Sequence, residues 1–363
     1  MQQVPQSCTV RHTINPYPTN PWRRFGFLAL IVLISACSQQ PVDSAEGEAR
    51  LAQGPVAVPT AQPASPPAGV ANVRIAVPAK FDPDRAFRYL EEVCRLGPRI
   101  SGTEGMKKQQ EMIDEHFTKL GAKVFYQQFD TSHPETGAPV KLQNMIVSWH
   151  PAARDRVLLC CHYDTRPRPD QEPYPPNRDK VFIGANDGAS GVALFMELGH
   201  ILPTLQTEVG VDFVFFDAEE LIYDNKRDRD RYFLGSQHFA KEYRDQPPQY
   251  RYLAGVLVDM IGDKNLQLYM EQNSMKLAPD VTRSVWAAAR QVKARHFISR
   301  IKHDVRDDHL ALNEIAKIPT CDVIDFDYPY WHTRNDLPSA CSGESLQEVG
   351  AVLTQWLINR PPR

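Results

Sequence analysis

Acidic residues and histidines stand at or soon after the ends of four apolar runs in this chain. The runs cover residues 157–161, 211–216, 253–258 and 320–324. The polar residues that follow them are His162, Asp164, Asp217, Glu219, Glu220, Asp259 and His332. Short apolar runs of this kind are typical of buried parallel strands, and ligands of open α/β sheets bind outside the carboxyl ends of the strands. We therefore expect these side chains to converge, although they are far apart in the sequence.

A glycine-rich turn brings one further acid into the same region. The segment Gly-Ala-Asn-Asp-Gly-Ala-Ser-Gly occupies residues 184–191 and leads into a predicted helix. Its glycines allow the backbone to pass close to a ligand, and Asp187 stands in the middle of the turn. An aspartate at this place could instead cap the helix that follows. Taken alone, Asp187 leaves both interpretations open.

The residue types at these strand ends suit a zinc ion. Imidazole nitrogens and carboxylate oxygens bind Zn²⁺ in four-coordinate sites that keep one position for water or substrate. Because consecutive residues leaving a strand point in different directions, one of Glu219 and Glu220 can bind metal while the other transfers protons. Taken singly, each residue has a simpler explanation. A histidine could be packed in the core, a glutamate could be a solvated acid, and Asp259 could cap a helix. Their joint placement predicts a catalytic metal site.

The elements that must position these residues indicate an α/β fold. Asp82-Pro83 predicts the start of a helix that runs to about Cys94, and Gly121 ends a second helix that begins at Glu104. Further helices are predicted over residues 190–202, 276–294 and 346–358. We expect a single domain with a mixed, mainly parallel central sheet flanked by helices on both faces.

The front of the chain is typical of an exported lipoprotein. Arg23 and Arg24 precede an apolar run at residues 25–34 that is too short to span a bilayer, and Ile-Ser-Ala-Cys ends at Cys37. We predict a lipoprotein signal peptide with a lipobox over residues 1–37, in which Cys37 becomes the lipid anchor to the membrane. An uncleaved membrane anchor is the alternative.

A Pro- and Ala-rich tether is predicted over residues 38–80, followed by a zinc-dependent catalytic domain over residues 81–361. An aspartate directly after the lipidated cysteine would retain a lipoprotein at the inner membrane, but this position is Ser38. We therefore expect a membrane-anchored protein on the periplasmic or cell-surface face of the outer membrane.

The overall charge bears on the partners. The formal net charge is -3 and the isoelectric point is near 6.4, which gives no electrostatic reason to expect a nucleic-acid partner. We expect a monomer with a small neutral or peptidic substrate.

The seven cysteines do not suggest a metal site, because none form a Cys-x-x-Cys pair and Cys160-Cys161 lies inside an apolar run. An exported protein could carry a disulfide between Cys321 and Cys341, which the sequence leaves open.

Six segments in order resemble the zinc aminopeptidases and the glutaminyl cyclases that share their fold. They are Cys-His-Tyr-Asp-Thr at 161–165, the glycine-rich turn at 184–191, Phe-Phe-Asp-Ala-Glu-Glu at 215–220, Leu-Val-Asp-Met-Ile-Gly at 257–262, Asp-Asp-His at 307–309 and Tyr-Trp-His-Thr at 330–333. The resemblance covers nearly all of residues 81–357.

The resemblance implies a role for each candidate residue. It implies that Asp187, Glu220 and His332 bind one Zn²⁺ and that Glu219 is the general acid/base. His162 and Asp259 are the positions that complete a second zinc site in the dinuclear aminopeptidases, whereas glutaminyl cyclases carry the equivalent groups without a second metal.

Flanking residues favour the cyclase. Trp331 precedes the ligand His332 and could form a wall of a pocket for an N-terminal glutamine, and Asp307 resembles the cyclase acid that hydrogen-bonds to the position of Asp259. The chain departs from some cyclases after Glu220, where residues 221–231 contain no tryptophan.

The function we expect is conversion of an N-terminal glutamine of peptides to pyroglutamate with release of ammonia. Asp259, with Asp307, would hold the amine or the departing ammonia. The first alternative is a metalloaminopeptidase with two zinc ions, and the second is a non-catalytic lipoprotein that only binds peptides. The intact Glu219 argues against a pure binder.

Overall fold

The computed structural model describes residues 80–223 and 231–359, which belong to one compact unit. The expected signal peptide, the Cys37 anchor and the tether up to residue 79 lie outside the described residues. Within the described ranges, no helix combines the length and the apolar character needed to cross a membrane.

A six-stranded mixed sheet forms the centre of the fold, in the order β1-β2-β4-β3-β5-β8. Neighbours β4, β3, β5 and β8 run parallel, whereas β1 pairs antiparallel with β2 and β2 with β4. The strands are β1 Lys123–Ser132, β2 Pro139–Trp149, β3 Asp155–His162, β4 Gly210–Phe216, β5 Arg251–Asp259 and β8 Thr320–Ile324. A separate parallel pair consists of β6 Leu268–Glu271 and β7 Phe297–Lys302. The expected mixed, mainly parallel sheet is confirmed.

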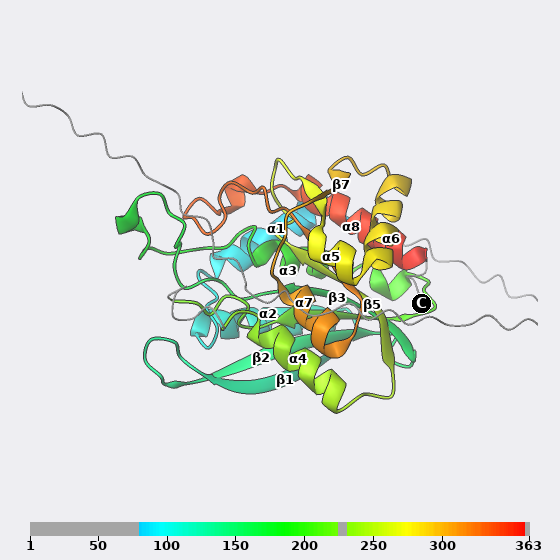
Figure 1. Cartoon of the computed structure of the whole chain (residues 1–363), viewed down its shortest axis with the longest axis horizontal. Helices are drawn as coiled ribbons and strands as arrows, with labels where there is room; N and C mark the ends of the chain where they lie inside the picture. Colours follow the sequence, from blue (N-terminus) through cyan, green and yellow to red (C-terminus); the bar gives the residue numbers. More distant parts are fainter. Residues whose placement is uncertain (1–79, 224–230, 360–363) are drawn as a thin grey trace, which may run out of the picture. The chain divides into compact units, whose positions relative to one another are not determined.

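Helices cover both faces of this sheet (Figure 1). They are α1 Pro83–Arg95, α2 Glu104–Lys119, α3 Ala189–Leu198, α4 Leu234–Asp245, α5 Gln272–Leu277, α6 Pro279–Gln291, α7 Asp308–Ala311 and α8 Gly343–Ile358. Short helical turns are η1 Pro175–Asn177, η2 Leu202–Thr204, the π-helical η3 Leu312–Ala316 and η4 Pro338–Ala340.

Alternate residues of β3 show how the two faces are filled. Val157 and Leu159 pack in the larger core cluster with α1, α2, α3, α6 and α8, while Leu158 and Cys160 pack in the second cluster with α4, α7 and η3. Strands buried on both faces carry apolar residues at consecutive positions, which explains why these central strands were visible as unbroken apolar runs.

Two expected helices end differently in the structure. The predicted helix over residues 276–294 is divided, because Ala278 has a non-helical backbone and Pro279, which lacks an N–H, begins α6. The helix predicted over residues 190–202 ends at Leu198, and η2 follows it. At the start of the domain, Asp82 accepts a hydrogen bond from the Arg85 N–H and caps α1 as predicted.

The chain turns sharply where it leaves the parallel strands. Ala218 after β4, Met260 after β5 and His332 after β8 all have positive φ angles, between 49° and 56°. Such left-handed backbone is uncommon for residues other than glycine, and it is frequent at functional sites. These turns bring the polar residues that follow the strands to one edge of the sheet.

Cys321 and Cys341 are both free, buried thiols. The disulfide that the sequence left open therefore does not join them in this structure.

Candidate metal centre

Asp187, Glu220 and His332 meet at the carboxyl edge of the sheet. Each offers one ligand atom, and these atoms lie within 4.8 Å of one another. His332 Nε2 is 2.6 Å from Glu220 Oε1 and 3.5 Å from Asp187 Oδ2, and all three side chains are buried. The three residues come from the glycine-rich turn before α3, the loop after β4 and the loop after β8.

The electrostatics of these three residues suit a cation. Burial and the charge of Glu220 raise the pKa of Asp187 to about 6. The buried Asp187 Oδ2 has no hydrogen-bond partner among the described residues. Burial alone would raise the pKa of Glu220, but the charge and the hydrogen bond of His332 lower it to about 2. A carboxylate–carboxylate–imidazole set with an unsatisfied buried oxygen fits a zinc ion.

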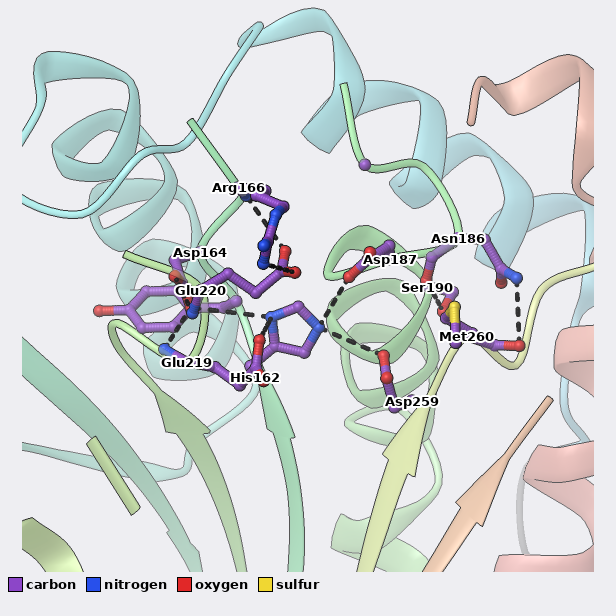
Figure 2. Close-up of polar contacts among 12 residues, drawn as sticks. His162, Asp164, Arg166, Asn186, Asp187, Ser190, Glu219, Glu220, Asp259 and Met260 are labelled. Carbon is purple, nitrogen blue, oxygen red and sulfur yellow. Dashed lines mark hydrogen bonds and ion pairs between the residues drawn. The ribbon is translucent and has the colours of Figure 1, made fainter. Parts of the chain in front are cut away.

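Asp187 also belongs to a second group of potential ligands, with His162 and Asp259. His162 Nε2 lies 3.2 Å from Asp187 Oδ1 and 3.2 Å from Asp259 Oδ1, and Figure 2 shows one ring nitrogen facing both carboxylates. Burial alone would lower the pKa of His162, but the neighbouring carboxylates of Asp164, Asp187 and Asp259 raise that pKa well above its usual value. The geometry brings together both residues that the resemblance placed in a second site.

Glu219 stands beside these ligands, in a position to exchange protons. Its Oε2 is 4.0 Å from His162 Nδ1, and its side chain is 12 % exposed. Burial, and then the charge of Glu220, raise the pKa of Glu219 well above its usual value. The pKa values of the two adjacent glutamates are thus shifted in opposite directions. A metal ligand requires the lowered pKa, and a proton-transfer group requires the raised one.

Asp164 fixes the loop that carries both glutamates. Its two carboxylate oxygens accept hydrogen bonds from the backbone N–H groups of Glu219 and Glu220, at 3.1 Å and 3.0 Å (Figure 2). Asp164 is completely buried. The sequence placed this residue at a strand end but gave it no role.

Three further residues orient the ligands, and the sequence did not indicate them. Arg166 donates its backbone N–H to Glu220 Oε2 and its Nη1 to Glu220 Oε1. Asp170 Oδ1 lies 3.1 Å from His332 Nδ1, on the ring edge opposite Nε2. Asp336 accepts the backbone N–H groups of Asn186 and Asp187. Contacts of this kind fix ligand orientation in metal sites. The sequence holds only a weak sign of these roles. Asp170 follows Arg166 by four residues, and Asp336 follows the candidate ligand His332 by four residues.

A pocket of about 370 Å³ opens onto this site. Its lining includes Glu219, Asp259, Asp307 and Trp331. Trp331 stacks on the ring of His332 with 4.0 Å between the centroids, and it is 36 % exposed. The predicted wall residue therefore lines the pocket and is partly exposed.

Asp307 and Asp259 share the pocket without the direct hydrogen bond that the resemblance suggested. Asp307 Oδ1 accepts the N–H of Asp308, and Asp307 Oδ2 has no hydrogen-bond partner among the described residues. Burial, and then the charge of Asp259, raise the pKa of Asp307 well above its usual value. The two carboxyl groups interact through their charges.

Comparisons with known proteins agree with this geometry. The family profile described as "Peptidase family M28" matches residues 144–357. The crystal structure of a Fimbriiglobus ruber glutaminyl cyclase is 43% identical, has a TM-score of 0.75, and is similar over 78% of this chain and 97% of that one. A Zn-dependent exopeptidase from Parabacteroides distasonis is 30% identical, with a TM-score of 0.72 over 78% of this chain and 100% of that one.

Among characterised sequences, the glutaminyl-peptide cyclotransferase of Drosophila melanogaster is 25% identical over 286 residues, which are 72% of this chain and 77% of that protein. The similarity thus extends to both kinds of enzyme that the sequence motifs indicated.

Proposed function

The chain belongs to peptidase family M28, and from that premise we propose that it is a zinc-dependent glutaminyl-peptide cyclotransferase. The observation that carries the proposal is the partly buried Glu219, with its raised pKa, beside the set Asp187, Glu220 and His332 in a pocket lined by Trp331. The similarity to the Fimbriiglobus ruber glutaminyl cyclase over 97% of that chain supports it.

The reaction joins two groups of one residue. The α-amine nitrogen of an N-terminal glutamine forms a bond to the γ-amide carbon, the bond from that carbon to the amide nitrogen breaks, and ammonia leaves. A zinc ion held by Asp187, Glu220 and His332 would supply Lewis-acid polarisation of the amide carbonyl. Glu219 takes one proton from the attacking amine and returns one to the leaving nitrogen. No water is consumed.

The acids in the pocket favour the amine end of the substrate. Asp259 and Asp307 line the same pocket as Glu219 and present carboxyl oxygens to an ammonium group or to the departing ammonia. Charge-assisted hydrogen bonds from such nitrogens to carboxylates are stronger than neutral ones. The exposed face of Trp331 would lie against the apolar part of the glutamine side chain.

An aminopeptidase is the second candidate, and one observation favours it. His162 and Asp259 form, with Asp187, a second group able to hold a metal ion. In that case Glu219 would take a proton from water, and the enzyme would release free N-terminal residues.

One assay distinguishes the two candidates. The purified protein, supplied with zinc, is incubated with a Gln-initiated peptide and a Leu-initiated peptide of otherwise equal sequence, and the products are weighed by mass spectrometry. A cyclase removes the mass of ammonia from the first peptide and leaves the second unchanged. Loss of a whole residue from either peptide would show an aminopeptidase. If both peptides stay unchanged, the protein has neither activity, and the non-catalytic binding protein is the remaining alternative.

We also propose that the enzyme is exported as a monomer and anchored through Cys37, on the strength of the lipobox. Cys37→Ala should move the protein from the membrane fraction to the soluble fraction. An unchanged distribution would contradict the anchor.

A further inference from the structure

Arg306 is the single lysine or arginine among the described residues that line the active-site pocket. Six carboxyl-bearing residues line the same pocket: Asp187, Glu219, Glu220, Asp259, Asp304 and Asp307. The side chain of Arg306 is exposed. Within residues 80–223 and 231–359, no hydrogen bond or ion pair engages its guanidinium group. An arginine with five donors thus stands at an acidic pocket without a protein partner.

The backbone on both sides of Arg306 is firmly held. The Val305 N–H donates to Glu271 Oε1 at 3.1 Å, and the Val305 carbonyl accepts from Asn273 Nδ2 at 2.9 Å. On the other side, Asp307 caps α7. Val305 and Asp307 are both buried, at 4 % and 5 % exposure, while Arg306 between them is exposed. The guanidinium group is therefore presented from an ordered loop.

The pocket combines six carboxyl-bearing residues with one guanidinium group. The acids around the metal centre, with Glu219 and Asp259, attract the α-ammonium group of a peptide and repel a carboxylate. Arg306 has the opposite preference, and its planar group can bind a carboxylate through two parallel hydrogen bonds. A peptide with its amine at the acids and a negative charge one residue further on would use both kinds of group.

We propose that Arg306 determines substrate specificity by binding a carboxylate on the residue that follows the N-terminal glutamine. The inference rests on the proposed cyclase function. The carboxylate can be the side chain of Asp or Glu at the second position, or the C-terminal carboxylate of a dipeptide. The contact lies away from the reacting atoms and is made equally before and during the reaction, so it acts on KM and leaves kcat unchanged.

The experiment measures kcat and KM for peptides of equal length with amidated C-termini that begin Gln-Glu, Gln-Gln and Gln-Lys. The dipeptides Gln-Ala and Gln-Ala-amide separate a terminal carboxylate from a side-chain carboxylate. The enzymes are the wild type, Arg306→Ala, Arg306→Glu and the control Arg283→Ala. Arg283 is an exposed residue of α6 outside the pocket, so its replacement removes the same charge elsewhere.

The wild type should favour Gln-Glu over Gln-Gln by about three- to tenfold in kcat/KM, and this preference should come from a lower KM for Gln-Glu. Arg306→Ala should abolish that preference, and Arg306→Glu should reverse it in favour of Gln-Lys, while Arg283→Ala keeps it. A merely structural role for Arg306 would not reverse the order of the substrates.

Two results would overturn the inference. Equal kcat/KM for all peptides with the wild type would show that no carboxylate is selected. An equal loss with every peptide in Arg306→Ala, without reversal in Arg306→Glu, would show that the residue only supports the loop. If no Gln-initiated peptide is cyclised at all, the proposed function itself fails, and this inference fails with it.

Discussion

Asp170 Oδ1 lies 3.1 Å from Nδ1 of His332, while the Nε2 atom of the same ring faces Glu220 and Asp187. Burial alone would raise the pKa of Asp170, but the adjacent imidazole of His332, together with the charge of Arg166, lowers it. The pair fixes the orientation of the imidazole, as a carboxylate commonly does behind a metal-binding histidine.

Replacing Asp170 by Asn should therefore weaken zinc binding about 10- to 100-fold, because the ring loses the anion that orients it. Competition with a chromophoric chelator measures this affinity. Asp179→Asn is the matched control, since Asp179 is exposed and its ion pair, within the part of the chain that the structure describes, is with the half-exposed Arg168 of the same loop. Unchanged affinity in Asp170→Asn would show that the contact has no role in metal binding.

Glu219→Gln should retain zinc and lower kcat by about 10² to 10⁴, the usual contribution of a positioned acid/base group. Glu220→Gln, which changes the neighbouring ligand, should lose zinc as well as activity. Metal content and turnover are measured on the same preparations. Near-normal turnover in Glu219→Gln would refute its assignment as the proton-transfer group.

The buried ion pair of Arg156 and Asp212 allows a prediction about the stability of the fold. Arg156 donates from Nε and Nη2 to the two oxygens of Asp212, and both side chains are almost fully buried. Arg156→Met should lower the free energy of unfolding by about 3 to 5 kcal/mol, because it leaves a buried carboxylate without its cation. Urea denaturation measures the loss. Arg156→Met with Asp212→Leu should recover part of it, and a double variant no better than the single one would contradict the explanation.

Glu271 makes a prediction about pH. Its carboxylate accepts the N–H groups of Asn273, Ser274 and Val305. Burial alone would raise the pKa of Glu271, but the nearby imidazole of His309 and the hydrogen bonds from these N–H groups lower it to about 2. Because the folded-state pKa lies below the usual value of 4.5, the stability that the ionised group contributes is present above pH 4.5 and is lost as pH falls toward 2.

Glu271→Gln should accordingly be less stable than the wild type at pH 7, by about 1 to 3 kcal/mol, and the difference should shrink as the pH is lowered below 4.5. Urea midpoints of both proteins across this range test it. A difference that stays constant with pH would mean that ionisation of Glu271 does not contribute.

The sequence was most informative where the strands are buried on both faces. Residues 157–161 and 211–216 form β3 and β4, and the acids after them mark the site. In contrast, β1 is exposed at alternate positions along much of its length and carries polar residues, so no apolar run indicated it. The short strands β6 and β7 were missed as well, since they lie in a separate pair outside the main sheet.

The grouping of the candidate ligands was easier to predict than the residues that contact them. Asp187, Glu220 and His332 lie in recognisable motifs, whereas Arg166, Asp170 and Asp336 gain their roles only through tertiary contacts. Asp336, for example, reaches the N–H groups of residues 186 and 187, about 150 positions earlier in the chain. A single sequence contains no periodicity that reports such a contact.

The measurement that tests the central claim most directly is an anomalous diffraction map at the zinc edge, from crystals grown with zinc. We expect one strong peak at about 2.0 to 2.2 Å from the ligand atoms of Asp187, Glu220 and His332. A second peak of equal strength beside His162 and Asp259 would favour the aminopeptidase. A map with its zinc peak elsewhere, or with none at these three residues, would contradict the account.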